Sequence, residues 1–179
     1  MKKNVLVFGA ISGVLVSTFM FFSMLYCSKH PDFEGSSSMV VGYACMLVAF
    51  SFIFVAVKNY RDHYNNGLVT FGKAFQIGLY IALIGSTCYV ITWALEYNFL
   101  FPDFMEKYSQ NMIDQMTKSG ASQQMIDAQI TEMAGYKEMY KSPVFFALFT
   151  YMEILPVGLI VSLISALILK RKAQPSQIA

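Results

Sequence analysis

The sequence predicts an all-α, polytopic membrane protein with four transmembrane helices and an external amphipathic helical hairpin between spans three and four. The first observation behind this prediction is four apolar stretches, at about residues 4–26, 38–57, 74–97 and 143–169. Each is long enough to cross a hydrocarbon core of about 30 Å, which takes about 20 residues of helix. The second is the composition, which is 56% hydrophobic and only 13% charged, an apolar surplus for a soluble domain. We therefore expect residues 1–179 to form a single membrane domain whose first partner is the lipid bilayer.

The third observation is the placement of basic residues, which predicts how the chain is threaded. Short basic segments precede the first span, separate the second from the third, and follow the fourth. Lysine and arginine beside span ends mark the cytoplasmic side, whereas charge in a long loop has little influence. Both termini and the 58–73 loop are therefore expected in the cytoplasm, with residues 27–37 and 98–142 outside. The basic residues concerned are Lys2, Lys3, Lys58, Arg61, Lys73, Lys170, Arg171 and Lys172.

The first span has a rival interpretation as a cleaved or lipidated secretory signal. Met1, Lys2 and Lys3 resemble a charged n-region, and Cys27 resembles a lipidated cysteine. The apolar run is too long for a usual signal, however, and bulky Tyr26 occupies the position before Cys27 that requires a small residue. We therefore expect this segment to remain as a transmembrane helix.

Small residues recur at a spacing of four in three of the spans. Because lipid-facing helices gain no hydrophobic energy by associating, such stripes allow the close backbone contact on which packing in membranes depends. The stripes have two interpretations, a specific face for a homo-oligomer or internal packing of one four-helix bundle, and the sequence favours the second. The candidate packing residues are Gly9, Gly13, Gly78, Ala82, Gly158 and Ser162.

Glu96 and Glu153 are the only acids within or at the edge of the apolar runs. Ionisable residues inside spans are costly and are candidates for function. One hypothesis places both acids, with Thr92 and Tyr89, around an outward-facing polar cavity of a small oligomeric transporter or channel component. The alternative places them in an outer interfacial belt together with Trp93. Counting about 20 residues back from the end of the fourth span favours the belt.

Residues 102–141 predict a helical hairpin, because this segment is too long for an ordinary loop and its apolar residues recur at spacings of three and four. Pro102 suits the start of the first helix, Gly120 its end, and Ser122 the cap of the second.

The hairpin is also rich in methionine, which has two interpretations. Soft thioethers select copper(I), but methionine also fills apolar interfaces, and packing or partner binding is the favoured interpretation. The methionines of the hairpin are Met105, Met112, Met116, Met125, Met133 and Met139.

The remaining polar motifs predict little chemistry. His30, Asp32 and Glu34 alternate in the first external loop, which would point three ligands the same way in an extended chain, but a solvated loop explains them equally well. The spans contain no nucleophile with a base, no acidic pair at a fixed spacing and no histidine cluster. We therefore expect no enzyme, no metal site, no cofactor and no nucleic-acid partner.

The connection between spans two and three resembles the central signature of a known family. It consists of Lys58-Asn59-Tyr60-Arg61, a turn at Asn66-Gly67, and the run Gly67-Leu68-Val69-Thr70-Phe71-Gly72-Lys73-Ala74-Phe75 leading to Gly78. With Gly9 and Gly13 in the first span, a long helical external segment and a basic C-terminus, the chain is similar to small four-span bacterial membrane proteins. That family is found largely in Bacteroidetes and is described as a domain of unknown function. The resemblance implies a bacterial inner-membrane location and four helices, and it transfers no activity.

These features together predict a non-enzymatic scaffold or accessory subunit of the bacterial cell envelope. Such a protein would bind another envelope protein through the external hairpin. The transporter or channel component around Glu96 and Glu153 is the alternative.

Overall fold

The computed structural model describes residues 1–29 and 36–171, with side chains from Met39 onward in the second of these ranges. This part of the chain is helical and has no β-strand, which confirms the predicted all-α class. Two of the helices are extended by a five-residue π-helical turn. These turns are Tyr60–Tyr64 after α2 and Glu96–Leu100 after α3. The α-helices are α1 (Lys2–Lys29), α2 (Ser36–Asn59), α3 (Phe71–Leu95), α4 (Phe104–Lys118), α5 (Gln123–Tyr140) and α6 (Pro143–Leu169).

Four helical segments are long and apolar enough to cross a membrane, as the sequence predicts. They are Lys2–Lys29, Met39–Tyr64, Phe71–Leu100 and Pro143–Leu169, with 28, 26, 30 and 27 residues. Most of these bounds lie outside the predicted apolar runs, because a helix continues through its interfacial residues before it ends. At the start of α3, for example, the Lys73 backbone N–H donates to the Thr70 hydroxyl at 3.3 Å, which caps the helix before its apolar run begins.

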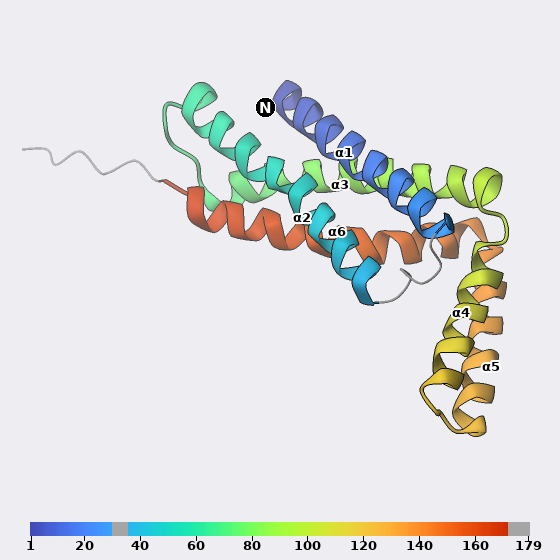
Figure 1. Cartoon of the computed structure of the whole chain (residues 1–179). Helices are drawn as coiled ribbons and strands as arrows, with labels where there is room; N and C mark the ends of the chain where they lie inside the picture. Colours follow the sequence, from blue (N-terminus) through green and yellow to red (C-terminus); the bar gives the residue numbers. More distant parts are fainter. Residues whose placement is uncertain (30–35, 172–179) are drawn as a thin grey trace, which may run out of the picture.

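The four spans form a bundle in which α3 packs against all of the other three (Figure 1). Gly9 of α1 contacts Ile84 of α3, and Gly13, further along α1, contacts Cys88, further along α3. These two helices therefore run in the same direction. The helix α6 runs antiparallel to α3. Small residues produce the closest approaches, since a Cβ atom built on Gly78 would lie 2.7 Å from Cβ of Ser162.

The six predicted packing residues all face another helix of the same chain. A Cβ atom on Gly158 would lie 2.7 Å from Cβ of Ala82, and one on Gly13 would lie 2.7 Å from Sγ of Cys88. The sequence analysis missed Gly85, where an added Cβ would come within 2.9 Å of the Phe50 ring. Phe50 is fully buried, and it fills the space that Gly85 and Gly158 leave between α2, α3 and α6.

One end of the bundle is tied together by polar contacts. The buried Asn4 side chain on α1 donates to the Ala56 carbonyl of α2 at 2.9 Å and accepts from the Asn59 amide at 2.9 Å. Beside them, the backbone groups of Val69 and Arg171 exchange hydrogen bonds of 3.0 and 2.8 Å. The start of α1, the end of α2, the start of α3 and the end of α6 therefore meet at this end.

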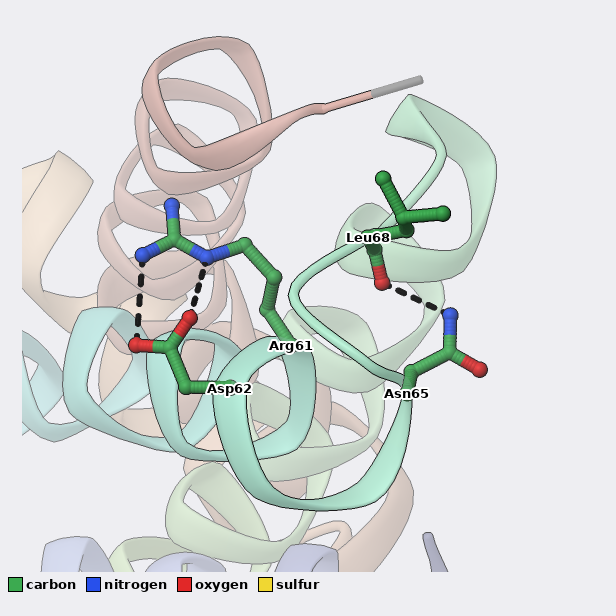
Figure 2. Close-up of polar contacts among 4 residues, drawn as sticks. All are labelled: Arg61, Asp62, Asn65 and Leu68. Atoms are coloured by element: carbon green, nitrogen blue, oxygen red, sulfur yellow. Dashed lines mark hydrogen bonds and ion pairs between the residues drawn. The ribbon is translucent and has the colours of Figure 1, made fainter. Parts of the chain in front are cut away.

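The turn between α2 and α3 is shaped by local polar contacts (Figure 2). Arg61 Nε donates to Asp62 at 2.7 Å. The Asn65 amide donates to the Leu68 carbonyl at 2.7 Å and closes the turn. Asn66 and Gly67 have φ angles of 51° and 76°, a left-handed conformation that asparagine and glycine adopt most readily. The turn predicted at Asn66-Gly67 is therefore present.

Candidate functional site

The hairpin of α4 and α5 leaves the bundle at the end opposite the Val69–Arg171 contact and turns away from it (Figure 1). An aromatic cluster fixes its base. The ring of Trp93 on α3 lies 4.9 Å from that of Phe104 on α4, edge to face, and 6.4 Å from that of Phe146 on α6. Tyr140 at the end of α5 packs edge to face on Phe146 at 5.3 Å. Such pairs each contribute about 0.5–1.5 kcal/mol beyond burial, so the base of the hairpin is held firmly.

Within the hairpin, α4 and α5 pack against each other along an apolar seam that includes the buried Met105, Ile126 and Met133. An ion pair between Lys137 of α5 and Glu106 of α4 crosses the exposed edge of the seam. Its hydrogen bond and charge lower the pKa of the Glu106 carboxyl and raise that of the Lys137 ammonium. The predicted helical pair is thus present.

A cavity of 420 Å³ lies beneath the base of the hairpin, between α1, α3, α6 and the two hairpin helices. A second, of 360 Å³, extends between α1 and α2. The two share six lining residues, so they adjoin each other. Methionine and aromatic side chains dominate both linings. The shared residues are Met20, Met24, Tyr89, Phe104, Tyr108 and Glu153.

Glu153 is the one charged side chain among the described residues that line these two cavities. It is exposed to them, and the Tyr89 hydroxyl of α3 donates a long hydrogen bond to its Oε1 at 3.4 Å. It forms no ion pair within the part of the chain that the structure describes. Burial raises the pKa of Tyr140, which also lines the larger cavity. The site therefore combines a single acid with an apolar, aromatic wall.

Of the four residues predicted to surround a polar cavity, the structure brings together only Tyr89 and Glu153. Thr92 instead donates to Ser17 of α1 at 3.0 Å. Glu96 is 2% exposed, and neither of its carboxyl oxygens has a hydrogen-bond partner in the described residues. The reason is depth. Glu153 lies level with Tyr89, whereas Glu96 lies two turns, about 10 Å, beyond Tyr89 at the start of the π-helical turn that follows α3.

The sequence analysis named the methionines of the hairpin but not the wall that they help to form. Met105 and Met133 line the larger cavity with Tyr108 and Tyr136. Their spacing of three along each helix is the signal that places them on one face. The α1 part of the wall, Met20 and Met24, had no signal of its own inside a uniformly apolar span.

The described residues were also compared with the residue groups that bind metal ions. No three histidine, cysteine, aspartate or glutamate side chains gather there as a metal-binding group. The pattern of His30, Asp32 and Glu34 lies outside the described residues.

Comparison with known proteins gives a family and nothing more specific. No curated protein and no solved structure matches the chain. A family model does match, over residues 7–171, and it covers most of the first candidate membrane-spanning helix, all of the other three, and the hairpin. By this match, the chain belongs to the family described as Protein of unknown function (DUF4199).

Proposed function

We propose that this protein is a non-enzymatic accessory subunit of the bacterial cell envelope, which binds another envelope protein through the hairpin of α4 and α5. The observation that carries this proposal is the shape of the hairpin. It packs on the bundle at its base through aromatic residues and projects beyond the bundle for the rest of its length (Figure 1). A short loop would be enough to connect α3 to α6, so the projecting hairpin is not needed to complete the bundle.

The projecting part of α5 carries large apolar side chains that nothing in the described chain covers. Met125 is 58% exposed and Ile130 is 46% exposed. They lie on either side of the seam that Ile126 and Met133 make with α4. Apolar side chains exposed beside such a seam are available to a partner, and their burial would favour its binding. A partner that contacts the hairpin on both sides of this seam would cover both.

The proposed orientation places both termini in the cytoplasm of a bacterial cell and the hairpin outside its inner membrane. Of the basic residues that predict this orientation, those that the structure describes flank the end of the bundle where Asn4 meets Asn59 and Val69 meets Arg171. The hairpin leaves the other end. Lysine and arginine beside the ends of spans are retained in the cytoplasm.

The transporter or channel alternative gains no support from the site. A polar pathway would need both acids in one cavity, but of the two only Glu153 is among the described residues that line the adjoining cavities. Methionine and aromatic side chains make up most of the lining.

Photo-crosslinking in cells tests the accessory role. A photoreactive amino acid replaces exposed Ala128 on α5, and mass spectrometry identifies the crosslinked protein. We expect a reproducible envelope protein with the wild-type hairpin and its loss in a Met125→Glu/Ile130→Glu variant. The matched control, Gln124→Glu/Thr131→Glu, adds the same charge at exposed polar positions of α5 and should retain the partner. Crosslinks to copies of this chain alone would contradict the proposal.

Labelling with a membrane-impermeant thiol reagent tests the orientation. In a background without Cys27, Cys45 and Cys88, intact cells should label Ser119→Cys at the hairpin tip and leave Asn66→Cys unlabelled until the membrane is opened. The reverse pattern would contradict the orientation while leaving the crosslinking result intact.

A further inference from the structure

We propose that the adjoining cavities beneath the hairpin bind an organic cation with an apolar body, and that the positive group of this ligand lies against Glu153. This inference goes beyond the accessory role, because it assigns a small-molecule site to the interior of the protein. It does not depend on which partner the hairpin binds.

Charge is the first argument. An ionisable side chain within a membrane bundle is costly and is usually paired. The exposed side chain of Glu153 lines both cavities, and among the described residues its carboxyl has only the long hydrogen bond from Tyr89 at 3.4 Å. The other residues described in the two linings are uncharged. A cationic ligand would supply the opposite charge at this position.

The aromatic wall is the second argument. Rings of tryptophan, tyrosine and phenylalanine attract cations to their faces within about 6 Å of the ring centroid, and tryptophan does so best. Trp93, Tyr89 and Phe104 line the larger cavity together with Glu153. Tyr108 and Phe104 also line the second cavity. An acid surrounded by rings favours a cation whose own surface is apolar over a hydrated metal ion.

The size of the two cavities and the methionines in their walls also favour a small organic ligand. Cavities of about 300–1,000 Å³ suit small molecules, and these have volumes of 420 and 360 Å³. Met20, Met24, Met105 and Met133 in the walls have flexible, polarizable side chains, which adapt to apolar bodies of different shapes. A membrane offers two sources for such a ligand, the ammonium headgroup of a lipid and a free lipophilic cation, and both present the same chemistry to Glu153.

Binding of a matched pair of probes to the purified full-length protein tests the proposal. Tetraphenylphosphonium and tetraphenylborate share a shape and differ in the sign of their charge. Titration calorimetry and quenching of the chain's single tryptophan, Trp93, should both show binding of the phosphonium and not of the borate. Glu153→Gln should weaken phosphonium binding at least tenfold, whereas Glu153→Asp, which keeps the charge, should retain the preference for the cation.

Glu132→Gln is the control variant, because it removes an exposed acid of α5 outside the two cavities, and it should bind like wild type. Equal binding of both probes, equal affinity of Glu153→Gln, or no binding to wild type would overturn the proposal. Competition then identifies the source. Displacement of the phosphonium by phosphatidylethanolamine but not by phosphatidylglycerol assigns the site to a lipid headgroup, and lack of displacement by either assigns it to a free cation.

Discussion

The two halves of the bundle are built from different residues and differ in how closely their helices pack. In the half that holds the polar tie of Asn4, glycine and serine bring α3 against α1 and α6. A Cβ atom added at Gly78 or Gly158 would lie only 2.7 Å from its neighbour there. In the half beneath the hairpin, methionine and aromatic side chains line cavities of 420 and 360 Å³. Within one short bundle, small residues close the space between helices and large residues enclose a cavity.

This contrast between the two halves indicates where a membrane bundle can hold a binding site. Helices in lipid associate through close packing rather than through the hydrophobic effect. We therefore expect the glycine-rich half to contribute most of the free energy of helix association. The other half is then free to keep its helices apart, because the hairpin base joins α3 and α6 across the gap through Trp93 and Phe146. Stability and binding are therefore expected to respond to different substitutions.

The largest effect is expected from placing the same side chain in each half. Gly158→Leu would drive a side chain into Cβ of Ala82 and the Phe50 ring, and we expect the free energy of unfolding to fall by about 3 kcal/mol. Gly42→Leu adds a side chain where no atom of another described helix lies within 4 Å of the added Cβ and should change stability by less than about 0.5 kcal/mol. Thermal unfolding of both variants in detergent measures this, and equal losses would remove the distinction between the halves.

A smaller loss is expected from the polar tie. Asn4→Leu leaves the Ala56 carbonyl and the Asn59 amide without their partner at a buried position, which costs about 1–3 kcal/mol. The tie lies far from the cavities, so phosphonium binding should be unchanged. Asn98→Ala, which removes an exposed hydrogen bond at the opposite end, serves as the control. A midpoint for Asn4→Leu equal to that of wild type would show that the tie contributes nothing to the closed half.

The smallest expected change is a gain. Glu96 is buried and its carboxyl oxygens have no partner within the described residues, and replacing a buried, unpartnered polar group by an apolar one commonly stabilises a protein. We expect Glu96→Leu to raise stability by about 1 kcal/mol, a rise in unfolding midpoint of about 2–4 °C for a chain of this size. A lower midpoint would mean that Glu96 has a stabilising role, and the contrast with Glu153 would have to be revised.

The sequence analysis located the acids but did not separate them. Glu96 and Glu153 look alike in a linear reading, since each lies near the outer end of an apolar run. What distinguishes them is the antiparallel register of α3 and α6, which sets Tyr89 level with Glu153 and leaves Glu96 two turns beyond. That register follows from contacts such as those of Gly78 with Ser162 and Ala82 with Gly158. No local pattern encodes it.

Four features could be predicted without a structure. They are the four candidate spans, the helical pair between the third and the fourth, the turn at Asn66-Gly67 and the small-residue stripes. These are local properties, because hydropathy, capping and backbone preference act within a few residues of the chain. Three facts follow from packing between helices. Gly85 and Phe50 meet, Met20 on α1 and Met105 on α4 face one cavity, and Glu153 is the one charged residue among the described residues that line it. Such facts depend on how separate helices approach one another, and packing across the bundle sets that approach.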